Sequence, residues 1–282
     1  MRRRIVTTIA AVAGAGVLAV GLWAFWLEPA RLTVSEEHII LPRWSLRPLR
    51  VAVLTDLHVG SPFNGLPKLR DLVVRTNAAK PDVICILGDL VIQGVLGGDF
   101  VAPEEIAGEL KHLRAPGGAL AVLGNHDDWL DHGRVRAALE NNGIRVLDDT
   151  AVKIDTPAGA LWLAGITDLW TGKHDLRAAL ANLDRDDVPA ILMTHNPDVF
   201  PSVPGRVALT LAGHTHGGQV WLPLIGRPIV PSRFGQRFAA GHLIEAGRHL
   251  FVATGVGTSI LPVRLFVAPA VTILTLTPED PP

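Results

Sequence analysis

Apolar and polar residues alternate along the first half of the chain in a pattern that predicts strands and helices in turn. Short β-branched runs such as 49–55 are typical of buried strands, whereas apolar residues at helical spacing over 66–80 predict a helix. A proline followed by acids, as at 103–105, suits the first turn of a helix. The expected elements are strands over 49–55, 83–87 and 119–123 and helices over 66–80, 103–113 and 131–142.

The second half of the chain is mostly short apolar runs. Strands are predicted near 152 and over 161–164, 191–194, 208–211, 219–222, 249–253 and 272–276, with one helix near 175–182. Such an order suits two packed sheets that are covered by helices on their outer faces. We therefore predict an α/β (α+β) fold of two mixed β-sheets flanked by helices.

The N-terminus combines a basic cluster with a long apolar segment. Arg2, Arg3 and Arg4 precede residues 5–27, which carry no charged side chain. A transmembrane helix needs about 20 residues, and Trp23, Phe25 and Trp26 stand at the far end, where aromatic rings favour the membrane interface. A buried core helix and a cleaved signal peptide are the alternatives. The apolar region of a signal peptide is normally only about 7 to 15 residues long, and no A-x-A-like site is evident just beyond Leu27.

The distribution of arginines predicts how this helix is oriented. Three arginines precede the span and only Arg31 lies in the first fifteen residues after it, although Arg43, Arg47 and Arg50 weaken the bias. The N-terminus is therefore expected inside. The chain would be a single-pass protein of the inner (cytoplasmic) membrane, with its main domain outside the cytoplasm. We predict an anchor over 1–27, a stem or edge strand over 28–48, the main domain over 49–277 and a tail over 278–282.

Composition narrows the chemistry that is available. A net charge of -1, with only 19% charged residues, excludes a disordered polyelectrolyte and argues against a nucleic-acid partner. The single cysteine, Cys85, excludes an internal disulfide and a cysteine-rich zinc site. Because the chain has 11 histidines, a metal site would have to use His, Asp and Asn.

Metal-type residues follow five of the predicted strands, directly at their carboxyl ends. They are Asp56 and His58, Asp89, Asn125 with His126 and Asp127, His195, and His214 with His216. Ligand sites in open α/β sheets form just beyond these ends, so the five loops could converge. Each cluster alone could be a turn or a helix cap, but two histidines between glycines at 213–217 have no packing purpose. Together the clusters favour a metal site.

The ordered pattern D-x-H, G-D, G-N-H-[DE], H and G-H-x-H resembles the calcineurin-like metallophosphoesterase superfamily. The matching segments are Asp56-Leu57-His58, Gly88-Asp89, Gly124 to Asp127, His195 and Gly213 to His216, within a resemblance that spans 49–276. The apolar start and the GHTHGGQ motif are similar to the bacterial membrane-associated branch that includes the YkuE-type and YaeI-type phosphodiesterases. After Asp89 the chain continues Leu-Val-Ile-Gln, without the Asp and Arg-Gly of protein phosphatases, which argues against that subclass.

The resemblance implies a binuclear metal centre. It places Asp56, His58, Asp89 and His216 on one ion and Asp89, Asn125, His195 and His214 on the other, with Asp89 as the bridge. Mixed nitrogen and oxygen ligands suit Mn(II), Fe or Zn(II) better than Ca(II) or Mg(II). His126 would be the catalytic residue that stabilises the phosphoryl group or protonates the leaving oxygen. That Asp127 orients His126 is a further hypothesis.

The segment 217–238 follows the last motif and carries Arg227, Arg233 and Arg237 among aromatic residues. It could be a solvated hairpin with ordinary surface arginines, or a lip that binds a phosphate or lipid head group. Trp129 and His132 are weaker candidates for the same rim.

These observations favour a membrane-anchored phosphoesterase that hydrolyses phosphodiester or pyrophosphate bonds of a phospholipid, glycolipid or other cell-envelope substrate. The resemblance makes a UDP-2,3-diacylglucosamine-type lipid A precursor a specific candidate, but an outward-facing domain would not reach a cytosolic nucleotide-sugar. The alternative is a catalytically inactive, membrane-tethered docking protein of the same fold, against which the complete motif set argues. The sequence does not predict an oligomeric state.

Overall fold

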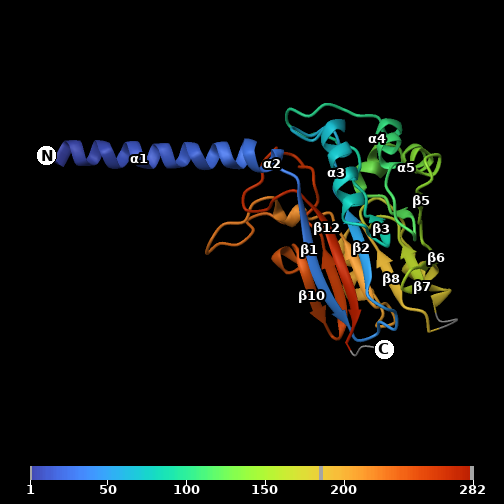
Figure 1. Cartoon of the computed structure of the whole chain (residues 1–282). Coiled ribbons are helices and arrows are strands. Elements are labelled where there is room, and N and C mark those ends of the chain that lie inside the picture. The colour runs from blue at the N-terminus through green and yellow to red at the C-terminus, as the bar shows by residue number, and fades with distance from the viewer. Residues whose placement is uncertain (1, 184–186, 280–282) are drawn as a thin grey trace.

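Two six-stranded sheets pack face to face and are covered by helices on their outer faces, as predicted (Figure 1). The computed structural model describes residues 2–183 and 187–279. Side chains from both sheets form the central core, with Val51 and Cys85 of the first sheet among Ile191 and Leu211 of the second. The packing of the two sheets fixes the positions of the loops at their ends.

The first sheet is parallel over four neighbouring strands. Its order is β1 (Thr33–Leu41), β12 (Ala270–Pro278), β2 (Leu49–Leu54), β3 (Val83–Ile86), β4 (Ala119–Ala121) and β5 (Arg145–Val146). Strands β2 to β5 run parallel, and β12 is antiparallel to β2 and parallel to β1. Helices α3 (Leu66–Ala78), α4 (Pro103–Leu110) and α5 (Asn125–Glu140) bury their apolar faces against its outer side. Parallel neighbours place several carboxyl strand ends along one edge.

The second sheet is also mixed. Its order is β10 (Gly241–Glu245), β11 (Arg248–Val252), β9 (Leu209–Ala212), β8 (Ala190–Met193), β7 (Gly159–Gly165) and β6 (Thr150–Thr156). Strands β11, β9, β8 and β7 are parallel. Its outer face packs against α6 (Leu176–Leu180), the 3-10 helix η3 (Pro197–Ser202) and Phe238.

Three details differ from the sequence prediction. Residues 219–222 do not form a strand, because Val220 and Leu222 make only isolated pairings with Leu265 and Gly226. Helix α5 begins at Asn125 rather than near 131, with an extended residue, Asp131, that kinks it at φ -179° and ψ 102°. Strands β5 and β10 were not predicted. The last residues of the expected tail, 280–282, lie outside the described residues.

The N-terminal segment is helical from Arg2 to Ala30. Helix α1 (Arg2–Leu22), the π-helical turn η1 (Trp23–Leu27) and α2 (Glu28–Ala30) follow one another directly. Residues Val6–Ala30 have a mean hydropathy of 2.0 and are long and apolar enough to cross a membrane. Figure 1 shows α1 projecting away from the body.

The end of this helix is fixed to the body by buried polar contacts. The Glu28 carboxylate is 3% exposed and accepts hydrogen bonds from Trp23 Nε1 at 2.6 Å and from the Phe266 amide at 2.8 Å. The Arg264 amide donates to the Ala24 carbonyl at 2.9 Å. Lys68 Nζ donates to the Pro29 carbonyl at 2.7 Å. The direction of the helix relative to the body is therefore set by tertiary contacts.

Arg264 stabilises the loop that receives the helix. It is fully buried, and its guanidinium donates to the carbonyls of Gly257, Val267 and Thr254. We expect Arg264→Ala to lower the free energy of unfolding by about 3 to 5 kcal/mol, because several buried carbonyls lose a charged donor. Chemical denaturation in detergent measures this change. Arg75→Ala, at an exposed i,i+4 pair with Asp71, is the control, and equal midpoints for the two variants would contradict the prediction.

Candidate metal centre

The structure brings together all the residues of the five predicted clusters at the carboxyl ends of β2, β3, β4, β8 and β9. Each ligand-type side chain is buried, from 0% exposure for Asp56 and His195 to 4% for His214. The residues that converge are Asp56, His58, Asp89, Asn125, His195, His214 and His216, with His126 beside them.

Two groups of ligand atoms lie side by side. Asp56, His58, Asp89 and His216 form one group, and Asp89, His195 and His214 form the other, each with its ligand atoms within 4.8 Å of one another. Asp89 belongs to both groups. Its Oδ2 lies 3.5 Å from His58 Nε2 and 3.2 Å from His195 Nε2. A single carboxylate thus stands between the two groups.

The backbone at these strand ends is held in an unfavourable conformation. Positive φ is uncommon for residues with a side chain, and here it recurs at Asp56 (48°), His58 (38°), Asp89 (54°), His214 (69°) and His216 (51°). Strain of this kind persists where the surrounding structure over-determines it, typically at functional sites. The two packed sheets supply that support and turn the side chains inward.

Backbone carbonyls fix the orientation of two histidine rings. His195 Nδ1 lies 2.7 Å from the Leu87 carbonyl, and His58 Nδ1 lies 3.2 Å from the Val91 carbonyl. Since a carbonyl only accepts hydrogen bonds, each Nδ1 carries a proton. Nε2 of each ring therefore faces Asp89, and a backbone carbonyl on the other ring nitrogen is the usual arrangement of a metal-ligating histidine.

The donor set fits divalent cations. Asp56 and Asp89 are buried, and their ion-pair partners among the described residues are histidines. Ring nitrogens meet at 3.1 Å, both between His58 and His216 and between His195 and His214. The buried Asn125 Oδ1 has no hydrogen-bond partner among the described residues. Buried carboxylates need a positive charge nearby, which a divalent cation would supply. The convergent imidazole nitrogens and the free amide oxygen could serve as further ligands of that cation.

Burial also sets the protonation of the histidines. It lowers the pKa of His58 and of His214 to about 3 and holds that of His216 well below its usual value, so these rings are neutral at physiological pH. At His195 burial also acts to lower the pKa, but the Asp89 carboxylate outweighs it and raises the pKa. Neutral imidazole is the form that binds metal, so three of the four rings are already in the ligating state.

Asp127 has a different role from the one hypothesised. Its Oδ1 accepts hydrogen bonds from the amides of Leu90 and Val91, and its Oδ2 accepts from the Gly124 amide at 3.0 Å. It therefore joins the loop after β3 to the first turn of α5 and does not hold the His126 ring. The His126 amide donates instead to Asp89 Oδ1 at 2.9 Å.

His126 lies beside both groups without belonging to either. Its ring packs edge-on against His58 at 4.7 Å between centroids and lies 4.9 Å from the ring of Trp129. It lines the pocket, is 8% exposed, and burial lowers its pKa. The ring is therefore placed to face a molecule that is bound in the pocket.

A pocket of about 410 Å³ opens above the two groups. Its floor includes Asp89, Asn125, His126, His214 and His216, and its rim includes Trp129, Trp170, Ile229 and Ile260. Sequence reasoning missed Trp170, which lies outside every motif, although its ring meets His214 edge-on at 4.2 Å between centroids. The site is polar at its base and apolar at its rim.

The three arginines of the predicted lip are not among the residues that line this pocket. Arg227 donates to the Gly217 carbonyl, beside the metal cluster. Arg233 lies 3.6 Å from Asp198, and Arg237 forms two hydrogen bonds with Glu245 at 2.6 and 2.7 Å. A role in holding a head group stays a prediction. His132 bonds Asp128 and Asp148 in an adjoining hollow that shares Trp129 and Trp170 with the pocket.

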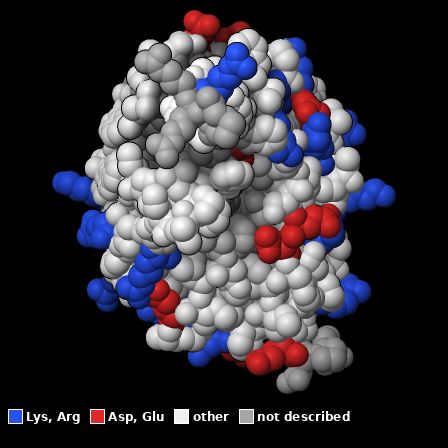
Figure 2. All heavy atoms as spheres, turned by 90° about the vertical axis from the view of Figure 1, so that its left-hand side faces the viewer, with Lys and Arg blue, Asp and Glu red and all other residues white. Residues whose placement is uncertain are grey.

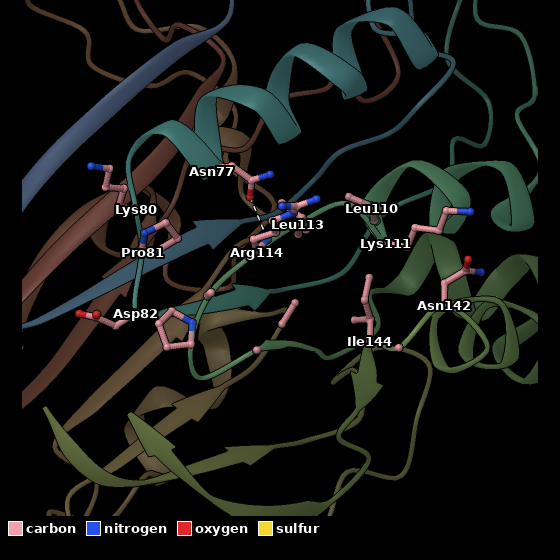
Figure 3. A pocket seen from close by; sticks show the side chains of 15 residues that line it. Asn77, Lys80, Pro81, Asp82, Leu110, Lys111, Leu113, Arg114, Asn142 and Ile144 are labelled. Carbon is pink, nitrogen blue, oxygen red and sulfur yellow. Dashed lines mark hydrogen bonds between the residues drawn. The ribbon is translucent and has the colours of Figure 1, made fainter. Parts of the chain in front are cut away.

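A second hollow lies at the opposite, amino ends of β3, β4 and β5 (Figure 3). Its volume is about 700 Å³, and the Arg114 amide donates to Asn77 Oδ1 at 2.8 Å within it. Its lining residues include Lys80, Asp82 and Lys111 but no histidine or cysteine. This hollow therefore lacks the cluster of histidine and aspartate side chains that lies at the base of the 410 Å³ pocket.

Gly124 is required by the close approach of two loops. A Cβ at this position would lie 2.3 Å from Asp89 Oδ1 and 2.7 Å from the Asp89 amide nitrogen. We expect Gly124→Ala to displace Asp89 and to lower turnover of a soluble diester by about 10²-fold, since small misplacements of catalytic groups have effects of this size. Gly133→Ala, whose Cβ would meet nothing closer than 3.5 Å, is the control. Normal turnover in Gly124→Ala would show that the Asp89 position is not critical.

Comparison with known proteins is consistent with this geometry. The profile of the family described as calcineurin-like phosphoesterase matches residues 49–218. The chain is 32% identical to phosphodiesterase YaeI of Escherichia coli (strain K12), over 95% of each chain. It is 29% identical to the uncharacterized metallophosphoesterase YkuE of Bacillus subtilis (strain 168), over 98% of this chain and 97% of that one. The Haemophilus influenzae NAD nucleotidase shares the fold, with a TM-score of 0.50 at 13% identity over 75% of this chain and 46% of that one.

Proposed function

The chain belongs to the calcineurin-like phosphoesterase family, and from this premise we propose that it is a membrane-anchored enzyme that cleaves phosphodiester or pyrophosphate bonds of a lipid-linked substrate. As a member of the family, the protein is a hydrolase that acts on phosphoester bonds, and its relatives use two divalent metal ions. The observation that carries the proposal is the pair of Asp-His groups below an apolar pocket rim.

We assign the ligands from the two groups of atoms. Asp56, His58, Asp89 and His216 would hold one ion, and Asp89, Asn125, His195 and His214 the other. The mixture of imidazole and oxygen donors suits Mn(II), Fe or Zn(II). Two ions held by these residues would supply Lewis-acid chemistry to the phosphoryl oxygens and would lower the pKa of a bound water.

The chain's own residues complete the reaction. Asp89 keeps the two halves of the site together, and its Oδ1 holds the first turn of α5 through the His126 amide. Water attacks phosphorus and gives up a proton to solvent, the bond from phosphorus to the leaving oxygen breaks, and that oxygen gains a proton. The His126 imidazole stabilises the transferring group or supplies this proton. Trp129 and Trp170 line the same pocket.

Hydrolysis assays on the full-length protein test the activity. The protein is first stripped of metal, Mn(II), Zn(II) or Mg(II) is then added, and the hydrolysis of a phosphomonoester, a phosphodiester and a pyrophosphate is measured with each metal. We expect diester or pyrophosphate cleavage to exceed monoester cleavage, with Mn(II) or Zn(II) more effective than Mg(II). Preference for the monoester would contradict the proposed reaction class. Failure with all three would instead favour a tethered protein without turnover.

The proposed location is the cytoplasmic membrane, with the body on its outer side. The support is the apolar helix preceded by arginines. Ile244→Cys tests the topology, because Ile244 is 60% exposed on β10 while Cys85 is buried with its pKa raised to about 12. A membrane-impermeant maleimide should label this variant in intact cells. Protection would place the body inside and make a UDP-2,3-diacylglucosamine-type lipid accessible as the substrate.

A further inference from the structure

Two loops next to the pocket expose large apolar side chains to solvent. The exposed fractions reach 106% for Leu224, 78% for Ile229 and 73% for Ile260. We call this set the docking face; its members are Trp221, Leu224, Ile225, Ile229, Ile260, Leu261 and Phe266. Contiguous exposed apolar surface of this kind marks a contact with another molecule or a membrane.

The charged residues of these loops are turned inward. Within 221–229 the only charged residue is Arg227, which donates to the Gly217 carbonyl. Within 256–266 the only charged residue is Arg264, which is fully buried. The view of this side in Figure 2 shows uncharged surface, with most charged side chains nearer its edges. Within 221–229 and 256–266, no charged side chain other than these two arginines stands against contact with an apolar phase.

The docking face is attached to the end of the apolar helix. The Phe266 amide donates to Glu28 at 2.8 Å, and the Phe266 ring meets Trp221 edge-on at 6.3 Å between centroids. The Trp26 ring, in the last turns of the helix, lies 5.6 Å from the Phe63 ring between centroids. Figure 1 shows the loop after β9 reaching out on the side from which α1 projects. A bilayer crossed by α1 would therefore meet these loops.

The same loops border the pocket. Ile229, Pro231 and Ile260 are among its lining residues, together with His126 and Asp89 from the metal groups. Ser259 links the two loops, since its amide donates to Gln219 Oε1 at 2.7 Å. A molecule that enters past Ile229 and Ile260 would come directly from whatever covers the docking face.

From this arrangement we infer that the docking face rests on the bilayer surface, so that the pocket opens at the boundary between lipid and water. The inference rests on the proposed membrane anchoring. It specifies the substrate class as an amphiphile whose chains stay in the bilayer while its phosphate group reaches the metal centre. Apolar side chains of the docking face, in contact with acyl chains, would hold the mouth of the pocket at the boundary between lipid and water.

Site-specific labelling of the full-length protein tests this inference. Ile225→Cys and Ile244→Cys are matched isoleucines with 64% and 60% exposure, one on the docking face and one on β10. Each accepts a polarity-sensitive nitrobenzoxadiazole probe, while Cys85 is fully buried. The proteins are placed in vesicles of phosphatidylethanolamine and phosphatidylglycerol, and vesicle flotation measures binding. We expect both proteins to float with the vesicles. The probe at 225 should have a blue-shifted emission that doxyl lipids quench. The probe at 244 should have the emission of a probe in water, and doxyl lipids should not quench it.

The possible failures separate the two proposals. A chain that does not float would overturn the membrane anchoring and the docking face with it. A chain that floats with a water-like probe at 225 would leave the anchor intact and overturn the docking face. A blue-shifted probe at 225 that doxyl lipids do not quench would mean that protein covers this face, which also overturns the assignment to lipid.

Discussion

Asp89→Asn is expected to abolish turnover and to prevent the simultaneous binding of two ions. Asp89 is the residue shared by the two groups of ligand atoms, and the substitution removes its negative charge with little change in volume. Two bound metals supply several kcal/mol of transition-state stabilisation, so we expect a loss of about 10³-fold or more. Turnover of a soluble diester and metal content by atomic emission measure the two effects.

The substitution is designed to leave the fold intact. Asparagine keeps an oxygen that can accept the hydrogen bond from the His126 amide, so the start of α5 keeps its partner. Asp82→Asn is the matched control, because Asp82 accepts a hydrogen bond from the Arg50 amide at the opposite ends of the strands. Near-normal turnover with two bound ions in Asp89→Asn would overturn the binuclear assignment.

His126→Ala is expected to keep both metal ions and to lose most of kcat. The ring lines the pocket and lies outside the two ligand groups, and general-acid or related help is worth about 10² to 10⁴-fold. His112→Ala, at an exposed position, is the control. Loss of metal from His126→Ala would mean that this histidine is a ligand.

A second substitution distinguishes the two roles of His126. Glutamine offers a hydrogen-bond donor but cannot transfer a proton as imidazolium does. His126→Gln should therefore recover part of the rate if the ring acts as a donor to the phosphoryl group. If proton transfer to the leaving oxygen is the role, Gln and Ala should be equally slow, and a substrate with a good leaving group should reduce the loss.

The sequence was sufficient to predict the metal-type residues because each follows a short apolar strand directly. Asp56, Asp89 and His195 could be placed at strand ends from local patterning alone, and parallel strands then bring those ends together. The helical start at Asn125 was missed because its first turn consists of polar motif residues rather than an apolar stripe. Local periodicity predicts elements only where one face is apolar.

Contacts between distant segments could not be predicted in this way. Asp127 bonds amides of the β3 loop 37 residues away, and Glu28 bonds the Phe266 amide 238 residues away. Glu28 appeared in the sequence as the polar beginning of a stem, yet it is buried as part of the joint between helix and body. Trp170 came near His214 only through the packing of the second sheet. Such roles depend on tertiary proximity rather than on spacing along the chain.

Titration of metal into stripped, full-length protein tests the central claim most directly. Mn(II) is added in steps while bound metal and the hydrolysis of a soluble phosphodiester are measured on the same samples. We predict that stripped protein is inactive and that turnover reaches its plateau only when two ions are bound per chain, since the two groups share Asp89. Full turnover with one ion, or with none, would contradict a binuclear centre.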